Sequence, residues 1–235
     1  MTAVATTSTY DPPLSPTART TVTRGKERVV SERAALYDVL DTALICHLGV
    51  DVGHPLVLPT AFGYDPDGPD AGGSLYVHGS VASRILTRSS EVTVCVTLTV
   101  LDGLVAARSA FHHSMNYRSA VILGTARLVT DDTEKRHALD LVIDHMIPGR
   151  ASTLRPHTRK ELAATAIVAV PLYEASVKAR AGGPVDEPED YAAGGWAGHI
   201  PLHTVADSPI PDEQAVGPVP AEVDDCAAEW GARGL

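Results

Sequence analysis

Residues 76–84, with the sequence YVHGSVASR, combine side chains that suit phosphate binding. A strand is expected to end at His78, Gly79 permits a tight turn, and Ser80 is placed to cap a helix with Arg84 one turn in. Hydroxyl groups, backbone N–H groups and a guanidinium would then face one point, which suits the phosphate of a small cofactor. A capped helix with a surface arginine has the same spacing, so these residues alone leave both interpretations open.

A second cluster of polar residues, HHSMNYRS at residues 112–119, lies between two apolar segments that resemble strands. Tyr117, Arg118 and Ser119 lead directly into the second of these segments. A polar group in a buried strand must be hydrogen-bonded or face a ligand. The cluster is therefore a candidate binding site, and a solvated loop between strands is the alternative.

The sequence does not indicate several common kinds of site. His112 and His113 are adjacent and lack the i, i+4 spacing of a helical zinc pair, so no metal site is expected. Cys46, Cys95 and Cys226 form no CxxC pair, which argues against a thiolate zinc site or a disulfide framework and fits a reducing compartment. No P-loop, GxGxxG or nucleophile-elbow motif occurs, so a phosphate would be bound by side chains on the fold.

The apolar periodicity predicts a mainly β fold. Residues 92–100 alternate between apolar and polar side chains, and Asp102 and Gly103 after them predict a hairpin turn into a strand over 104–108. Two helices are expected, one over 31–42 capped by Ser31 and one from Asp131 or Asp132 to His145. The other strands are expected at 43–50, 55–62, 74–78, 117–129, 164–172 and 175–179. These elements predict an antiparallel barrel with flanking helices.

The charge of the chain lies in its C-terminal segment. The 235 residues carry a net charge of −10, and residues 186–235 hold eleven acidic residues and one basic residue, which accounts for all of it. The sign argues against nucleic acid as a partner. No apolar run approaches the ~20 residues that cross a bilayer, and no secretory signal is present, so no membrane contact and a cytoplasmic location are expected.

The composition also predicts the domain organisation. We expect a flexible arm over 1–25, a single domain over 26–205 and a disordered acidic tail over 206–235. Trp196 lies in a Gly- and Pro-rich segment, where it either anchors residues 186–202 to the barrel or contacts a cofactor.

Four segments together resemble a known family: residues 76–84, VCVTLTVLD at 94–102, GLVAARSAFHHSMNYRSAVILGTA at 103–126, and 183–202 with PVDEPEDY and WAGHIPL. They are similar to the flavin-nucleotide-binding branch of the pyridoxamine 5'-phosphate oxidase-like split barrels, which are related to the nitroimidazole-reductase resistance proteins. The resemblance covers about residues 24–205. It implies a six-stranded antiparallel split barrel, a homodimer, and FMN in a groove shared by the two subunits.

The resemblance also implies roles for particular residues. Ser83 and Arg84 would hold the FMN phosphate together with Ser80, and the backbone of the second strand would line the flavin ring. His78 is the candidate catalytic residue, because an imidazole with a reference pKa of ~6.5 can exchange protons near neutrality. The implied cofactor contacts are Leu58, Pro59, Thr60, His78, Gly79, Ser80, Ser83, Arg84, Tyr117, Arg118, Ser119 and Trp196.

One departure from the family bears on the activity. The Arg- and His-rich segment that binds the substrate phosphate in the true oxidases has no counterpart after Trp196, so vitamin B6 oxidation is not expected. The expected function is that of an FMN-dependent oxidoreductase acting on a small organic molecule. Two alternatives stay open: a split-barrel enzyme that takes a deazaflavin or haem, with His112 or His113 as the haem ligand, and a non-catalytic FMN-binding sensor.

Overall fold

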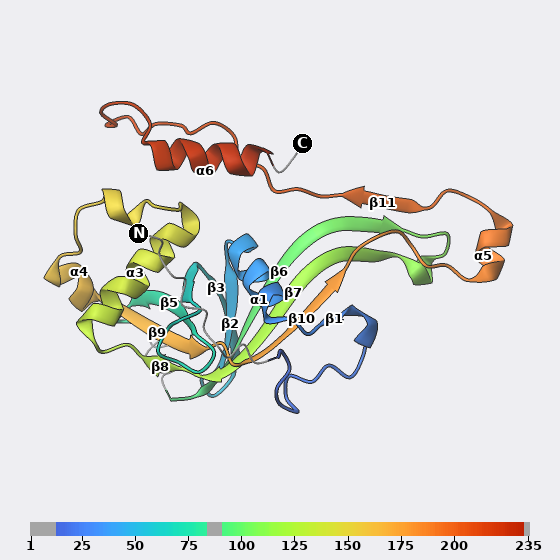
Figure 1. Cartoon of the computed structure of the whole chain (residues 1–235), viewed down its shortest axis with the longest axis horizontal. Helices are drawn as coiled ribbons and strands as arrows, with labels where there is room; N and C mark the ends of the chain where they lie inside the picture. The colour runs from blue at the N-terminus through green and yellow to red at the C-terminus, as the bar shows by residue number, and fades with distance from the viewer. Residues whose placement is uncertain (1–12, 84–90, 233–235) are drawn as a thin grey trace, which may run out of the picture.

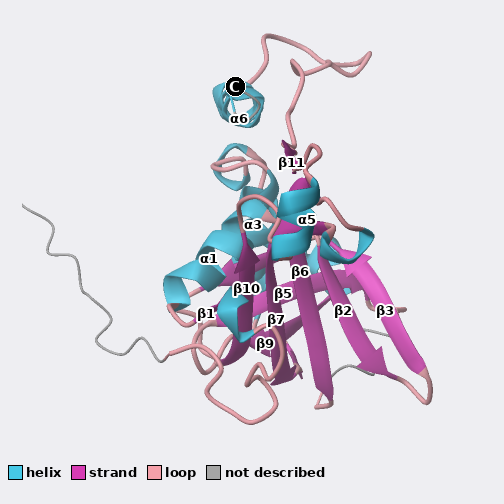
Figure 2. Cartoon of the chain, turned by 90° about the vertical axis from the view of Figure 1, so that its right-hand side faces the viewer, coloured by secondary structure: helices cyan, strands magenta, loops and turns pink. Residues whose placement is uncertain are grey.

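The computed structural model describes residues 13–83 and 91–232, and two antiparallel sheets form its centre (Figures 1 and 2). The larger sheet has the order β1-β10-β7-β6-β2-β3, with β11 also paired to β6, and the smaller has the order β4-β5-β9-β8. The strands of the larger sheet are β1 (Val29–Val30), β2 (Cys46–Asp51), β3 (Pro55–Thr60), β6 (Thr93–Ala106), β7 (Ser114–Thr125), β10 (Glu174–Arg180) and β11 (Gly198–Pro201). Those of the smaller sheet are β4 (Phe62–Asp65), β5 (Ser74–Ser80), β8 (Arg127–Leu128) and β9 (Thr165–Pro171).

The fold is the predicted split barrel, with more strands than the expected six. The larger sheet contains seven strands and the smaller four among the described residues. Three of the additions, β1, β8 and β11, are two to four residues long and lie at the margins of the sheets. The mainly antiparallel class and the flanking helices are confirmed.

Both predicted helices are present, and one of the two begins at its predicted capping residue. They are α1 (Arg33–Thr42), α3 (Asp132–Met146), α4 (Arg159–Ala164), α5 (Pro188–Ala193) and α6 (Ala221–Ala232), with 3-10 turns η1 (Lys26–Arg28), η2 (Ala110–His112) and η3 (Ala151–Thr153). The Asp131 carboxylate accepts N–H bonds from Thr133 and Glu134 and so caps α3, as expected. The prediction that Ser31 caps α1 is wrong, because Glu32 occupies the N-cap position, without a side-chain hydrogen bond.

An aliphatic core fills the space between the two sheets. Leu36 and Leu40 of α1 are fully buried in it, so α1 packs into the barrel as well as covering it. A second cluster lies on the outer face of the smaller sheet, where Leu139 of α3 and Leu162 of α4 cover Tyr76 and Ile167. Because helices cover one face of β9 and the core covers the other, its sequence TAIVAVP is almost continuously apolar.

The predicted hairpin at Asp102 and Gly103 is wrong. Strand β6 continues through both residues with a register shift between Leu101 and Gly103, so the Asp-Gly pair lies at a bulge. Gly103 is required there because β11 passes close by: a Cβ atom on it would lie 2.9 Å from the carbonyl oxygen of Ile200. The residues predicted as a second hairpin strand therefore extend β6 beyond the barrel.

This extension forms a projecting arm. We call residues 101–117 and 180–202 the arm; they contain the outer halves of β6 and β7 together with α5 and β11, and lie at the right of Figure 1. Strand β11 pairs with β6 from Gly198 opposite Ala106 to Pro201 opposite Gly103. The arm is thus a continuation of the barrel's own sheet.

The expected flexibility of residues 1–25 does not hold for the described part of that segment. Leu14 is buried, and its N–H donates to the carbonyl of Ser31. Thr17 and Arg19 both bind the carboxylate of Glu174 at the start of β10. The N-terminal segment is therefore attached to the sheet beside β1.

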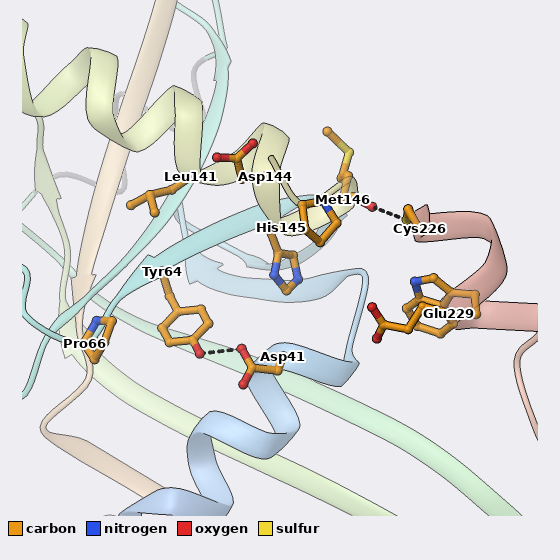
Figure 3. Close-up of a pocket in the computed structure, with 11 residues that line it drawn as sticks. Asp41, Tyr64, Pro66, Leu141, Asp144, His145, Met146, Cys226 and Glu229 are labelled. Atoms are coloured by element: carbon orange, nitrogen blue, oxygen red, sulfur yellow. Dashed lines mark hydrogen bonds between the residues drawn. The ribbon is translucent and has the colours of Figure 1, made fainter. Parts of the chain in front are cut away.

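The expectation of a disordered tail over 206–235 is likewise wrong for helix α6. Its residues Val223, Cys226, Ala227 and Trp230 follow helical spacing and are all partly buried, while none is fully buried. Glu222 binds Arg150 at 2.8 Å and attaches α6 beside α3, whose end faces Cys226 in Figure 3. No helix within residues 13–83 and 91–232 has the length and apolar character needed to span a membrane.

Candidate functional site

The ends of β3 and β5 meet where the chain crosses from one sheet to the other. Thr60 ends β3, and two residues later Phe62 opens β4 and pairs with Val77 of β5. This pairing places Thr60 near His78, the residue after Val77. We call this region the junction of β3 and β5: Thr60 lies at it beside His78 and Gly79, Leu58 and Pro59 precede Thr60 on β3, and Ser80 ends β5.

Strand β3 presents a free edge at this junction. Among the described residues it pairs only with β2, so alternate backbone N–H and C=O groups on its other side have no strand partner. Pro55 and Pro59 fit this position, since proline lacks the N–H that a central strand needs. Such an edge can hydrogen-bond the polar rim of a planar ligand.

His78 is the group at the junction whose hydrogen bonding is incomplete. Its Nδ1 atom is buried and has no hydrogen-bond partner among the described residues. Burial lowers the pKa of His78 below its usual value of 6.5, so the imidazole is neutral at pH 7. A neutral imidazole with an unpaired nitrogen fits a site that receives a polar ligand, because a buried polar atom is normally hydrogen-bonded.

The turn after β5 differs from the prediction in one respect. The strand runs two residues past His78, through Gly79 to Ser80. Ser80 then organises the turn: its Oγ accepts the N–H of Ala82 at 3.2 Å, and its carbonyl accepts the N–H of Ser83 at 2.8 Å. Ser83 therefore lies close to the junction, and Arg84 lies outside the described residues.

The second predicted group of site residues, at the start of β7, does not lie at the junction of β3 and β5 within one chain. Tyr117, Arg118 and Ser119 lie on β7, and two strands, β2 and β6, separate β7 from β3. At a spacing of ~4.8 Å between strands, the two sets are about 14 Å apart along the sheet. A ligand could contact both sets only if they came from different subunits or if it spanned the sheet.

Arg118 is already paired within the chain. Its guanidinium donates to Asp102 of β6 at 3.0 Å and to Asp38 of α1 at 2.7 Å, and it reaches Thr42 at 3.3 Å. The hydrogen bonds that Arg118 donates to Asp102 and Asp38 raise the pKa of Arg118 well above its usual range. The side chain thus ties α1 to the sheet, a role that the spacing in sequence could not show because its partners lie 16 and 80 residues away.

Trp196 does not anchor the arm. Its side chain is 74% exposed and packs over Gly198 of the same segment. The attachment comes from Asp186, a buried residue whose carboxylate accepts the backbone N–H and the guanidinium of Arg108, each at 3.0 Å. Burial alone would raise the pKa of Asp186, but its bonds to Arg108 bring the pKa below the usual value.

Removing this attachment should release residues 186–202. In an Asp186→Ala variant the buried groups of Arg108 lose their acceptor, and we expect chymotrypsin to cut at Tyr191 and Trp196 about tenfold faster, as for a locally unfolded segment. Limited proteolysis followed by mass spectrometry measures this rate. Glu189→Ala on the exposed face of α5 is the control, and equal rates in the two variants would contradict the prediction.

A groove of about 580 Å³ lies along the arm, between residues 111–114, which include the two adjacent histidines, and the segment that follows β10. The Nδ1 atom of His113 lies 2.9 Å from the carbonyl oxygen of Ser109, so Nδ1 carries the proton and Nε2 is left as a metal-binding atom. Arg28 and Arg180 line the same groove together with Glu27, which pairs with Arg28 at 3.4 Å. Both arginines are far from His113 in the sequence, which gave no indication of this grouping.

The split barrel and the junction of β3 with β5 define the class of protein: a barrel of the pyridoxamine 5'-phosphate oxidase type. A family model described as pyridoxamine 5'-phosphate oxidase matches residues 32–179. The chain belongs to this family.

Solved structures of relatives agree with this assignment. The flavocytochrome Anf3 from Azotobacter vinelandii is 36% identical with a TM-score of 0.82, and the match covers 90% of this chain and 97% of that one. The FAD and haem binding protein from Mycobacterium smegmatis is 39% identical with a TM-score of 0.77, over 85% and 97% of the two chains. A candidate 5-nitroimidazole antibiotic resistance protein from Bacteroides thetaiotaomicron is 25% identical with a TM-score of 0.51, over 64% and 85%. No curated protein matches the chain.

Proposed function

We propose that this protein binds a flavin at the junction of β3 and β5 and acts as a cytoplasmic oxidoreductase on a small organic molecule. The observation that carries the proposal is the buried Nδ1 of His78, which has no hydrogen-bond partner within residues 13–83 and 91–232, beside an edge of β3 that no described strand covers. The family and the two relatives named for flavin or FAD support it. FMN is the flavin that the sequence predicts, and FAD is the one named for the M. smegmatis relative.

The residues of the junction have three different roles in this proposal: they bind the phosphate, contact the flavin ring and exchange a proton with the substrate. A bound flavin supplies hydride transfer, and the protein supplies orientation and polarity. Ser80, Ser83 and Arg84 bind the phosphate, and the backbone of β3 at residues 58–60 donates to and accepts from the ring. His78, which burial keeps neutral, holds the proton that is exchanged with the substrate at Nδ1.

The visible spectrum of the freshly purified protein tests the proposal. We expect flavin absorption bands, or their appearance on titration with FMN or FAD, and we expect Arg84→Ala to weaken flavin binding at least tenfold because a charge-assisted phosphate contact is lost. Wild-type protein without flavin bands before or after both titrations would overturn it. Bound flavin that neither NADH nor NADPH reduces would favour the sensor alternative.

Haem binding at the groove of His113 is a second candidate function. The Nε2 of His113, for which the described residues provide no partner, fits an iron ligand, and the nearby Arg28 and Arg180 fit partners for propionate groups. Two relatives are named as a flavocytochrome and a haem binding protein. A Soret band that His113→Ala removes, while the flavin bands persist, would establish this site, and a spectrum without a Soret band after addition of haemin would exclude it.

We also propose that the arm pairs two subunits. Ile200, Leu104 and Met115 lie opposite one another on three neighbouring strands and form an apolar row that is 41–53% exposed. Phe111 and Trp196 are exposed on the same arm. Soluble proteins seldom leave such a row uncovered, and a homodimer would cover it and bring Arg118 and its neighbours toward the partner's junction.

A charge in the middle of this row should separate the subunits. We expect Leu104→Asp to be a monomer by light scattering coupled to size-exclusion chromatography, since a buried unpaired carboxylate is strongly unfavourable. Val216→Asp, at a fully exposed position far from the row, is the control and should keep the mass of the wild type. A wild type that elutes as a monomer would contradict the proposal.

A further inference from the structure

The arm carries a short segment with a pair of glycines on each side of it. We call residues 184–193 the strap; they contain α5 and lie at the right of Figure 1. Of the glycines at 182–183 and 194–195, Gly182, Gly194 and Gly195 have positive φ angles of 95°, 77° and 100°. A Cβ atom on any of the four would have no described atom within 4 Å of it, apart from its chain neighbours. Each end of the strap therefore has the conformational freedom of glycine and no packing that restrains it.

The chain beyond each glycine pair is held by the larger sheet. Arg180, at the end of β10, donates to the carbonyl of Gly183 at 2.9 Å and to the buried Asn116 of β7. After the second pair, Trp196 packs over Gly198, where β11 begins its pairing with β6. The two glycine pairs thus lie at the boundaries between a fixed part of the arm and the strap, where the hinges of a moving segment are expected.

The hydrogen bonds, ion pairs and ring contacts of the strap reach two residues outside it, within residues 13–83 and 91–232. The first is Arg108, whose backbone N–H and guanidinium donate to the fully buried carboxylate of Asp186. The same guanidinium lies 4.8 Å from the ring centroid of Tyr191. The second is His112, whose Nε2 lies 3.6 Å from Glu187. We call the contacts of Asp186 and Tyr191 with Arg108 the latch.

The latch leaves one buried donor without an acceptor. The Nε atom of Arg108 is buried and has no hydrogen-bond partner among the described residues. Such a donor is unfavourable, and water would satisfy it once the strap moved away. The latched position is therefore less stable than a fully paired one, which places the strap among the segments that open locally before a domain unfolds.

The strap also forms one wall of the groove of about 580 Å³ that runs along the arm. Gly183 and Val185 line the groove on this side, and Phe111, His112 and His113 line the other side. Val185 is 74% exposed and Phe111 is 90% exposed, so both apolar side chains are uncovered at the groove. The His112 side chain, in contrast, is only 20% exposed, with the strap beside its Nε2. A movement of the strap would therefore change access to the groove and to His112.

We propose that the strap is a gate on this groove, which opens on the two glycine pairs and closes when Asp186 binds Arg108. The open strap admits a ligand, and the latched strap retains it, with Val185 and Phe111 covering its apolar surface. The identity of that ligand rests on the haem-binding proposal, whereas the movement of the strap does not.

Modification of histidines by diethyl pyrocarbonate tests the movement on the full chain without a ligand. The reagent adds to an unprotonated imidazole nitrogen, and mass spectrometry of peptide fragments separates the rates of His112 and His113. We expect His112 of the wild type to react about tenfold slower than the exposed His113, because the strap covers it. Asp186→Asn keeps an acceptor for the N–H of Arg108 but loses the charge, and should make His112 react about fivefold faster with His113 unchanged. Glu189→Gln, at an exposed position of the strap, is the matched control and should react as the wild type does.

Stopped-flow mixing with haemin tests whether the strap controls the groove. We expect Asp186→Asn to raise the rates of haemin association and dissociation, the latter about tenfold, because the gate is open for more of the time. Glu189→Gln should leave both rates unchanged. If the wild type binds no haemin, the haem-binding proposal fails, and the rates at His112 alone decide on the gate.

Three results would overturn the proposal. Equal rates for His112 and His113 in the wild type would show that the strap does not cover His112. An unchanged rate at His112 in Asp186→Asn would show that the latch does not hold the strap. Faster reaction of His112 with unchanged haemin kinetics would show a strap that moves without controlling the groove. Circular dichroism of each variant verifies that it is folded.

Discussion

Replacing Gly63 with alanine is expected to lower the free energy of unfolding by about 3 kcal/mol, at the upper end of overpacking effects. Gly63 lies on β4, where α3 crosses the smaller sheet. A Cβ atom there would lie 2.7 Å from the backbone carbon of Leu141 and 2.7 Å from the backbone nitrogen of Val142. Neither neighbour is a flexible side chain that could turn away, so α3 itself would have to move from the sheet.

Thermal unfolding followed by circular dichroism measures this effect. For a chain of this size, about 3 kcal/mol corresponds to a Tm lower by roughly 6–12 °C. Gly183→Ala is the matched control, because no atom lies within 4 Å of its added Cβ and its backbone conformation is an ordinary one. If the two alanine variants melt at the same temperature, α3 does not pack on β4 as described.

Arg127→Met is expected to be the second most damaging change, costing about 2–3 kcal/mol at pH 7. Arg127 on β8 donates two bonds to Asp70, at 2.7 and 2.8 Å, and two to Glu134 of α3. Tyr76 also donates to Glu134, at 3.0 Å. Loss of the guanidinium leaves two partly buried carboxylates facing each other. The figure is below that for a fully buried pair, because Arg127 is about one-third exposed.

The pH dependence of this loss has a definite sign. Burial alone would raise the pKa of Asp70, but hydrogen bonds from Arg127 and Ser74 bring it below the usual 3.8. A lowered pKa contributes stability above pH ~4 that disappears as the pH falls through the folded-state value. We therefore expect the difference between wild type and Arg127→Met to be largest at pH 5–7 and to shrink below pH 4.

Urea unfolding at pH 7, 5 and 3.5 checks this dependence. Arg155→Met removes an exposed ion pair with Glu161 and serves as the control, with no measurable change in the free energy of unfolding expected. A difference for Arg127→Met that stays constant across this pH range would show that the loss comes from packing and not from charge.

Local sequence patterns predicted the parts of the fold that local chemistry determines. The alternation of residues 92–100 predicted β6, the apolar run over 164–172 predicted β9, and Asp131 marked the start of α3. The prediction of a hairpin turn at Asp102 and Gly103 was wrong because pairing with β11 outweighs the local turn preference of these residues. Strand β11 lies nearly 100 residues later in the sequence, so the local pattern could not show this pairing. Helix α6 was not predicted, because the acidic composition of residues 206–235 was interpreted as disorder and the four apolar residues at helical spacing were not considered.

In the candidate site, too, the sequence predicted the local features and not the contacts between distant segments. His78, Gly79 and Ser80 could be found because they are adjacent at a strand end, and the structure places them beside Thr60. The partners of Arg118, and the attachment of the arm by Asp186, depend on contacts between distant segments that no spacing reveals. Sequence reasoning therefore located the junction but not the contacts that fix Arg118 and the arm.

The pairing of β1 with β10 has a consequence for how the nascent chain can fold. Val29 lies opposite Lys178, so roughly 150 residues must be translated before this edge of the sheet can close. At ~5–20 residues per second, the N-terminal segment remains unpaired for roughly 7–30 s after its synthesis. During that time its two valines and Leu14 lack their final cover, which makes the emerging chain dependent on chaperones or on its own polar N-terminal composition to avoid association.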